Sequence, residues 1–309
     1  MNSLMALLDR KISWQKLGLV IKPRRDLWWM QTHAMTPTLE PLGGGRLRVY
    51  FSGRSDKNIS HIGWATIDLA KPTEIENFSP EPVLLPGELG CFDDNGVTPA
   101  SIVTEGGRTY LYYIGWNPGS TVRMHLFGGL AISEDGGRSF IRASRAPIIE
   151  RSAVNPFLNT APFVLHESGL WRMYYVAGVG WRHRDLPRYN IQYATSRNGV
   201  DWQRDGTVAI DFASEEECAL ARPFVLKDEG RYKMWFAHKG EAYRLGYAES
   251  EDGVHWRRDD SLANLEPSPS GWDSAMVEYA AVTRHEGRYF MFYNGDNYGF
   301  DGIGVAVGQ

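Results

Sequence analysis

The sequence has little cysteine and no long apolar run, and each absence excludes a class of protein. Its two cysteines, Cys91 and Cys218, are far apart and lack Cys-x-x-Cys spacing, which argues against a disulfide framework and a zinc site. No stretch approaches the roughly 18 apolar residues that a membrane-spanning helix needs. Asp9 and Arg10 follow the first apolar residues too soon for a secretory signal. We therefore expect a cytoplasmic protein without a membrane span, in which residues 1–11 form a short helix or fray.

An excess of one charge is also missing. The chain carries 33 basic and 37 acidic residues, a net charge of -4, which provides no electrostatic footprint for nucleic acid or an anionic membrane. The eight histidines show no metal-ligand spacing, and Gly43–Gly45 lacks the Gly-Lys-Ser/Thr of a phosphate-binding loop. We expect no metal, no cofactor and no nucleic-acid partner. Aromatic residues, by contrast, make up 13% of the chain, with 11 tryptophans, which favours β-structure and sugar-type ligands.

One strand–turn–strand unit recurs five times along the chain. Four copies begin with the residue before a proline, at Thr36, Thr98, Ala161 and Arg222, and the fifth begins at Glu278 without the proline. The first four starts are 62, 63 and 61 residues apart (98−36, 161−98, 222−161). Each copy has an apolar strand, a glycine-containing turn, a strand of alternating aromatics and a third strand. Three copies then continue with Ser-x-Asp/Asn-Gly, at Ser133, Ser196 and Ser250, which predicts a tight turn.

A fourth strand should complete each unit. The expected segments in the first four units are Glu81–Pro86, Ala146–Glu150, Gly206–Asp211 and Ser261–Glu266. The fifth unit ends at Gln309 without room for one, whereas an unpaired strand pattern occupies about residues 12–23. We therefore predict an all-β fold, a five-bladed β-propeller of four-stranded antiparallel blades, in which this N-terminal strand completes the last blade and closes the ring. Residues 1–309 would form a single domain.

These five units resemble the five-bladed β-propeller glycosidases. That superfamily includes glycoside hydrolase families 32, 43, 62 and 68 and the family 130 mannoside phosphorylases. The resemblance implies a carbohydrate-active protein with its site in a central funnel. The family 43 acidic positions hold Met35, Thr36, Ala100 and Ala221 here, although Glu278 holds the last of them in the fifth unit. Glu217-Cys218 matches a family 32 dipeptide without its flanking residues, so no single family is matched.

Cleavage of a glycosidic bond requires two carboxyl groups across the bond, one of them protonated at the working pH. The loops that feed the inner strands of a propeller face the funnel, which selects Asp94, Glu217 and Glu278 as candidate catalytic residues. Glu278 stands out because the equivalent positions are Thr160 and Ala221. For Glu217 the alternative is a solvated acidic run. Asp93 and Asp273 each follow an aromatic residue before a strand, where a structural role in a turn is favoured over catalysis.

Basic residues form the second predicted set. The expected mouth positions include His33, Arg54, Arg182, Arg222, His238 and Lys239. Arginine forks bind carboxylate or phosphate, so the ligand would be an anionic glycan or glycoconjugate, or inorganic phosphate would be the nucleophile. The alternative is that these arginines form structural bridges to acidic residues. The loops after the second strands add Trp116, Asp296 and Tyr298 as further substrate-binding candidates.

These observations lead to a glycoside hydrolase-like enzyme that cleaves or transfers a glycosyl unit by carboxylate acid/base chemistry. One alternative is an inverting glycoside phosphorylase that binds phosphate through the basic set. The other is a non-catalytic propeller that binds a glycan or acts as a scaffold.

Overall fold

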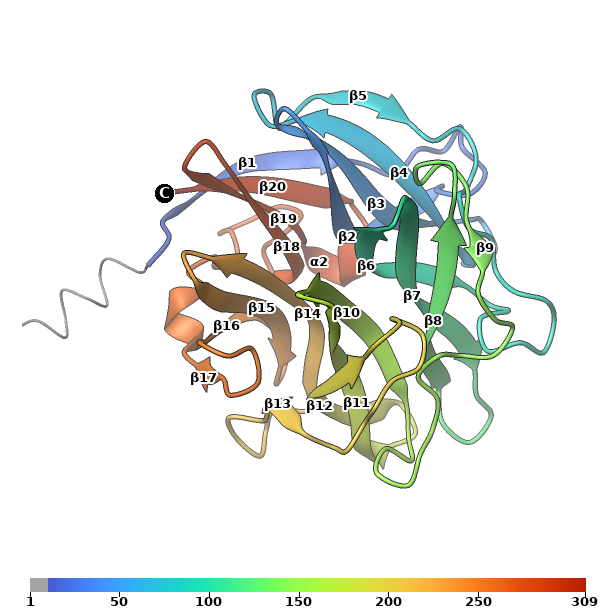
Figure 1. Cartoon of the computed structure of the whole chain (residues 1–309). Helices are drawn as coiled ribbons and strands as arrows, with labels where there is room; N and C mark the ends of the chain where they lie inside the picture. The colour runs from blue at the N-terminus through green and yellow to red at the C-terminus, as the bar shows by residue number, and fades with distance from the viewer. Residues whose placement is uncertain (1–10) are drawn as a thin grey trace, which may run out of the picture.

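The computed structural model describes residues 11–309, and nearly all of its regular structure is β-strand. This confirms the predicted all-β class. The short helix expected at the start of the chain lies outside the described residues. Figure 1 shows the strands as sets arranged radially, with β2, β6, β10, β14 and β18 toward the middle; we call these the inner strands.

Five sets of four strands follow one another along the chain. The first is β2 (Thr32–Gly43), β3 (Arg46–Arg54), β4 (Ser60–Asp68) and β5 (Ile75–Phe78). The second is β6 (Val97–Glu105), β7 (Arg108–Pro118), β8 (Met124–Ser133) and β9 (Ile141–Arg142). The third is β10 (Asn159–Glu167), β11 (Leu170–His183), β12 (Leu186–Ser196) and β13 (Val208–Ile210). The fourth is β14 (Ala219–Asp228), β15 (Arg231–Lys239), β16 (Tyr243–Ser250) and β17 (Arg257–Arg258).

The fifth set draws on both ends of the chain. It contains β18 (Glu278–His285), β19 (Arg288–Asn294), β20 (Ile303–Gly308) and β1 (Trp14–Ile21), with β1 antiparallel to β20. Consecutive strands within each set pair antiparallel. The second, third and fourth sets are joined into one 12-stranded sheet. Single parallel contacts, Asn159 with Phe127 and Tyr189 with Ala219, make these joins.

Three of the outer strands differ from the prediction. β5, β9 and β17 each precede the expected segment, whereas β13 falls within Gly206–Asp211. The expected segment at Glu81–Pro86 forms only an isolated bridge, Leu84 with Ile62, and the one at Ala146–Glu150 forms only Ile149 with Gly128. Prolines within both segments cannot donate to a ladder, so pairing does not extend. The fourth expected segment begins within a 3₁₀ turn (η1, Asp260–Leu262).

The Ser-x-Asp/Asn-Gly turns connect neighbouring sets. In the third set, Ser196 Oγ accepts the Gly199 N–H at 2.9 Å, and Tyr112 of the second set donates to the Gly199 carbonyl at 2.8 Å. The same contact recurs from Tyr174 to Gly253 at 2.7 Å. Gly199 has a φ of 73°, and a Cβ there would approach the Tyr112 hydroxyl to 2.8 Å. The turn therefore needs glycine both for its backbone and for the close approach of the tyrosine.

Buried aromatic residues fill the spaces between sets. Tyr112, Tyr174 and Trp235 from the second strands are fully buried within such clusters. This packing holds the inner strands at fixed positions around the centre, where the candidate site lies. The described residues contain no helix with the length and apolar character needed to cross a bilayer.

Candidate active site

A cavity of about 310 Å³ lies where the inner strands meet. Each inner strand contributes the residue that precedes the repeat's proline position, which Ala280 holds in the fifth repeat. These residues are Thr36, Thr98, Ala161, Arg222 and Tyr279. Its remaining lining comes from the ends of the second strands and the starts of the third strands. The cavity is therefore assembled by the whole chain and not by one loop.

The backbone is strained at the points where it faces this cavity. Thr36, Ala161, Arg222 and Tyr279 have φ between 48° and 57°, a region that costs non-glycine residues of the order of 1–3 kcal/mol. At each of them the strand pairing shifts register. Such a bulge removes a residue from the ladder and redirects its side chain. Repetition of this strain in four sets, always at the cavity wall, marks the cavity as the candidate site.

Arg222 closes the centre of the cavity. Its side chain is 3% exposed, and its terminal nitrogens donate to the Ala100 and Thr36 carbonyls, with Nη2 also donating to the Pro37 carbonyl at 2.7 Å. Burial lowers the pKa of Arg222 to about 9. Because these nitrogens already bind β2 and β6, Arg222 fastens inner strands together. Its predicted role in holding an anion remains a prediction.

Three further cations line the cavity: Arg54, Arg123 and Lys239. Arg54 donates to Asn58 Oδ1 at 3.0 Å, and Lys239 Nζ lies 5.4 Å from the centre of the Tyr243 ring. Within residues 11–309 none of these three forms an ion pair. Burial lowers the pKa of Arg54, with Arg123 adding to the effect. Asp185 is the one carboxylate in the described lining, so the cavity carries an excess of positive charge.

Tyrosines form one side of the cavity. Tyr189, Tyr243, Tyr279 and Tyr298 all line it. The Tyr189 and Tyr243 hydroxyls are 2.7 Å apart, and the Tyr243 ring centre lies 5.9 Å from that of Tyr279 and 6.2 Å from that of Tyr298. Tyr298 belongs to the short turn α2 (Asp296–Gly299) and is 37% exposed. Aromatic faces and hydroxyl groups together suit a sugar ligand.

Glu278 lies directly behind this tyrosine wall. It is fully buried at the start of β18, next to Tyr279, and neither carboxyl oxygen has a hydrogen-bond partner within the described residues. Burial raises the pKa of Glu278 well above its ordinary value, and the nearby Tyr279 hydroxyl and Lys239 ammonium offset only part of this. This setting favours the protonated form of the carboxyl group. It can therefore act as a proton source.

Glu217 is also buried, at 6% exposure, but it is fully paired. Arg258 donates to both carboxylate oxygens, at 2.6 and 2.8 Å, and His238 Nδ1 lies 2.9 Å from Oε1. The Ala213 N–H donates at 2.7 Å. Burial alone would raise the pKa of Glu217, but these contacts outweigh it and lower the pKa to about 2. The alternative of a solvated acidic side chain does not describe this position.

Two other sets carry a comparable acidic site. Asp93 accepts from Tyr113 at 2.9 Å and from Arg142 at 2.8 Å. Asp273 accepts from Tyr293 at 3.0 Å and from Lys16 at 2.6 Å. In both, the tyrosine lies 20 residues after the acid and the cation lies on the outermost strand of the set. These contacts support the structural role favoured for both aspartates.

Glu217 takes the corresponding place in the fourth set. Phe236 follows it by 19 residues (236−217), and Arg258 comes from the outermost strand β17. Phenylalanine supplies no hydroxyl here, and Arg258 donates to both carboxylate oxygens of Glu217. We therefore group Glu217 with Asp93 and Asp273 as acids that fasten an outer strand to its set.

The twelve predicted site residues divide by position. Five line the central cavity: Arg54, Trp116, Arg222, Lys239 and Tyr298. Seven do not: His33, Asp94, Arg182, Glu217, His238, Glu278 and Asp296. Asp94 lies near the rim, where it accepts from Asn117 Nδ2 at 2.7 Å. Asp296 accepts the N–H groups of Ala275 and Met276.

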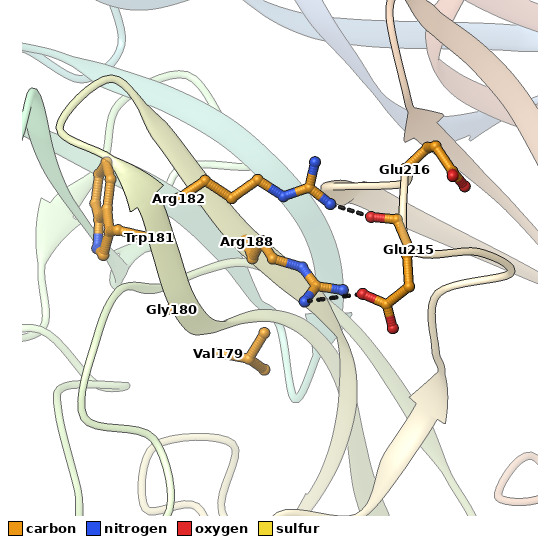
Figure 2. A pocket seen from close by; sticks show the side chains of 7 residues that line it. All are labelled: Val179, Gly180, Trp181, Arg182, Arg188, Glu215 and Glu216. Atoms are coloured by element: carbon orange, nitrogen blue, oxygen red, sulfur yellow. Dashed lines mark hydrogen bonds and ion pairs between the residues drawn. The ribbon is translucent and has the colours of Figure 1, made fainter.

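His33 and Arg182 lie at different edges of the site. Burial, together with the charge of Arg54, lowers the pKa of His33 to about 4. Arg182 lines a separate groove (Figure 2), in which it donates to the Glu215 carbonyl. Within residues 11–309, no cluster of three or more His, Cys, Asp or Glu side chains is placed to hold a metal ion.

Four lining residues were not predicted from the sequence: Arg123, Asp185, Tyr189 and Tyr243. Arg123 lies in the connection between β7 and β8, and Asp185 lies in the connection between β11 and β12. The repeat pattern does not cover these connections, so it does not predict that they reach the cavity. Tyr189 and Tyr243 are near the starts of third strands. Each third strand pairs antiparallel with the second strand, so the start of the third strand lies beside the end of the second. The reasoning that selected the ends of the second strands could therefore have found Tyr189 and Tyr243.

The sequence of the chain is similar to those of two proteins reported below. No protein-family model matches the chain. The Mycobacterium tuberculosis (strain H37Rv) protein Rv1502, described as uncharacterized, is 41% identical over 297 residues, which cover 96% of this chain and 99% of that protein. The 1,2-β-oligomannan phosphorylase of Thermoanaerobacter sp. strain X514 is 25% identical over 240 residues, covering 76% of each chain.

Solved structures show the same fold. A complex of BT0996 with RGII has a TM-score of 0.77 and 19% identity, covering 99% of this chain and 95% of its own. A family 130 structure, from a family of mannoside phosphorylases that contains hydrolases acting on β-1,2 mannosidic linkages in Candida mannan, has a TM-score of 0.71 and 14% identity, covering 96% and 94%. Family 43 and family 32 glycosidases are also similar. The predicted resemblance to propeller glycosidases, without a match to one family, is confirmed.

Proposed function

The chain belongs to the same protein family as Rv1502, and we propose that it is a carbohydrate-active enzyme that cleaves a glycosidic bond with inorganic phosphate. The observation that carries this proposal is the charge of the central cavity. Arg54, Arg123 and Lys239 line it without an ion pair among the described residues, and its described lining has a single carboxylate. Hydrolysis by two carboxyl groups would need a second acid that faces the bond in addition to Asp185. Glu217 and Asp94, the predicted partners of Glu278, both lie outside this lining.

Phosphate would bind between the unpaired cations. A guanidinium fork binds two phosphate oxygens, and an ammonium adds a point charge. Because Arg54 and Lys239 are partly withdrawn from water and Arg222 is fully buried, an entering dianion would gain charge-assisted hydrogen bonds that bulk water does not match. The anionic ligand predicted from the basic residues is thus the second substrate.

The proton would come from Glu278 through Tyr279. A phosphate oxygen bonds to the anomeric carbon while the glycosidic carbon–oxygen bond breaks, and the leaving oxygen takes the Tyr279 hydroxyl proton. Glu278 replaces that proton, and the proton released by the bound phosphate returns to Glu278. The pKa of Tyr279 is raised well above its ordinary value, first by burial and then by Glu278. The hydroxyl therefore stays protonated and is a weak acid, so in the proposed step it gives up its proton only as it takes one from Glu278. A single displacement inverts the anomeric configuration.

The glycan would lie on the tyrosine wall. Tyr243 and Tyr298 offer aromatic faces, and Trp116 lines the same cavity. The names of the oligomannan phosphorylase and of the family 130 structure make β-1,2-linked mannosides the first substrates to test. Phosphorolysis suits a cytoplasmic enzyme, because phosphate is abundant there and a charged sugar phosphate is retained.

The proposed site also depends on how the ring is built. We propose that the five strand sets are the blades of one closed five-bladed propeller, formed by residues 1–309 as a single domain. The pairing of β1 with β20 and the radial arrangement in Figure 1 support closure by the N-terminal strand. Such closure holds the fifth set, and with it Glu278 and Tyr279, against the cavity.

The test is turnover of glycosides with and without phosphate. The purified protein would be incubated with β-1,2-mannobiose and a panel of other disaccharides, and phosphorus NMR would detect a sugar 1-phosphate. We expect product only with phosphate, with a loss of about 10²–10³-fold in the Lys239→Met and Arg54→Gln variants. Arg24→Gln, a change at an exposed arginine paired with Asp26, serves as the matched control.

Other results would redirect the proposal. Release of free sugar at the same rate without phosphate would replace phosphorolysis by hydrolysis. Saturable binding of these glycans without turnover, with or without phosphate, would favour a glycan-binding protein over an enzyme.

A further inference from the structure

One carboxylate reaches the central cavity without a strong partner. Asp185 is the one acidic residue in the described lining, and its side chain is 54% exposed. Its ion pair within residues 11–309 is with the adjacent Arg184, whose Nε lies 3.8 Å from Oδ1. An exposed pair at this distance contributes little, and no hydrogen bond to the carboxylate occurs within the described part of the chain. Both oxygens are therefore available to a ligand.

The backbone holds Asp185 at a defined place beside the cavity. His183 of β11 pairs with Leu186 of β12. The connection between them is a two-residue turn, Arg184 and Asp185. The Arg184 carbonyl accepts the N–H of Arg123 at 2.8 Å, which ties this turn to the connection between β7 and β8. The Asp185 N–H donates to His183 Nδ1 at 3.3 Å. Two hydrogen bonds in so short a turn restrict it, which lowers the entropic cost of binding a ligand there.

One edge of the cavity leads from Asp185 to the tyrosine wall. Asp185, Pro187 and Tyr189 occupy alternate positions at and just before the start of β12, and all three line the cavity. Alternate residues of a strand face the same side, and the Tyr189 hydroxyl lies 2.7 Å from that of Tyr243. Four residues of extended chain span about 13 Å, which is further than one pyranose ring reaches. A glycan on the tyrosine wall therefore contacts Asp185 through a further sugar unit.

The charges of the cavity act on different parts of the substrate pair. Arg54, Arg123 and Lys239 are the cations that would take phosphate, and the same positive charge would also attract acidic sugars. A carboxylate beside the glycan opposes that attraction, because a like charge that faces a partly desolvated anion weakens binding. A neutral sugar meets no such repulsion, and its hydroxyl groups can donate to the two carboxylate oxygens.

We propose that Asp185 determines which glycans the site accepts: it binds hydroxyl groups of a neutral sugar unit beyond the bond that breaks, and it excludes sugars that carry a carboxylate. This inference rests on the proposed function, since it concerns the glycan substrate of the phosphate-dependent reaction. Asp185 thereby acts on substrate choice, whereas the bond-breaking step depends on Glu278 and Tyr279.

The experiment compares neutral and acidic glycans in the wild type and in Asp185→Asn. The full-length protein would be given phosphate with β-1,2-mannobiose, or with its analogues oxidised to a carboxylate at C6 of either unit. Initial rates would give kcat and KM for each. We expect Asp185→Asn to raise KM for the neutral disaccharide about tenfold, with kcat little changed. The rate with the acidic analogues relative to the neutral disaccharide should rise about tenfold, and KM for phosphate should not rise.

Asp56→Asn is the matched control, because Asp56 is exposed in the connection between β3 and β4 and does not belong to the described lining. It should leave the preference for neutral glycans unchanged. A preference that Asp185→Asn does not move, or an equal fall in kcat with every glycan at unchanged KM, overturns the proposal and leaves the phosphate-dependent reaction intact. Isothermal titration calorimetry with the same disaccharides covers the other case. Wild-type binding without turnover, with a preference for neutral glycans that Asp185→Asn removes, supports the role of Asp185 and contradicts the enzymatic function.

Discussion

The fourth and fifth strand sets each bury a glutamate at or just before the start of the inner strand, and the two glutamates differ in what surrounds them. Glu217 faces Arg258 and His238 and has its pKa lowered to about 2. Glu278 faces tyrosines, has no hydrogen-bond partner within the described residues and has its pKa raised. The surroundings therefore favour the anionic form of Glu217 and the protonated form of Glu278.

The difference distinguishes a structural glutamate, Glu217, from the proposed catalytic one, Glu278. Charged, paired acids at the outer strands recur in the second, fourth and fifth sets, as Asp93, Glu217 and Asp273. The neutral acid has no counterpart, because Thr160 and Ala221 occupy the equivalent positions. A buried carboxyl group without a partner costs stability, and such a cost is expected where a function depends on it.

The largest expected effect is on activity, at Glu278. Glu278→Gln keeps the shape of the side chain but removes the proton source, and we expect turnover to fall by about 10²–10⁴-fold. Glu217→Gln, the matched change in the neighbouring set, should retain near wild-type turnover at a temperature where it is folded. Initial rates of both variants with the same glycoside and phosphate make the measurement. Equal losses in the two variants would remove the distinction between them.

The next effect is on stability, at Arg258. Arg258→Met leaves Glu217 buried with only His238 and one backbone N–H, and we expect a loss of about 3 kcal/mol in the free energy of unfolding. Chemical denaturation at neutral pH measures it. Arg46→Met, which removes an exposed pair with Glu76, is the control and should cost far less. A small loss in Arg258→Met would mean that the pair does not hold β17.

The smallest expected effects are on the pH dependence of folding stability, to which Glu217 and Glu278 contribute with opposite signs. The folded pKa of Glu217 lies below the unfolded value of about 4.3, so its contribution is present above that pH and is lost as pH falls toward 2. The folded pKa of Glu278 is raised, so its contribution is complete below about pH 4.3 and is lost as pH rises through the folded pKa.

Melting temperatures across pH test this pair of signs. Glu278→Gln should become more stable than the wild type as pH rises above neutral, by an amount of the order of 1 kcal/mol or more. Glu217→Gln should be less stable at neutral pH and should approach the wild type below about pH 3. Parallel pH curves for either variant and the wild type would contradict the corresponding assignment.

The repeat made much of the fold predictable. Its spacing located the inner strands, and the missing fourth strand of the last unit pointed to the N-terminal segment that pairs as β1. The outer strands were placed less well, because Leu84 and Ile149 occur beside prolines and form only isolated bridges. Apolar character alone does not show whether backbone N–H groups are available for a ladder.

The candidate site was predictable in part for a related reason. Glu278 stood out because its sister positions are not acidic, and burial then gave it a distinct setting. The partner of Glu217 was not foreseeable, since Arg258 lies 41 residues further along the chain on a two-residue strand. The contacts of Arg222 were equally hidden, because they are backbone carbonyls from other sets, which no side-chain pattern reveals.

The protonation state of Glu278 is the point on which the contrast between the two sets depends, and infrared difference spectroscopy measures it directly. Spectra of the wild type at neutral pH would be compared with those of Glu278→Gln and Glu217→Gln. We predict that Glu278→Gln removes the carbonyl band of a protonated carboxylic acid and that Glu217→Gln removes only carboxylate bands. Loss of a carboxylate band in Glu278→Gln would show that Glu278 is ionised and would contradict its role as the neutral acid.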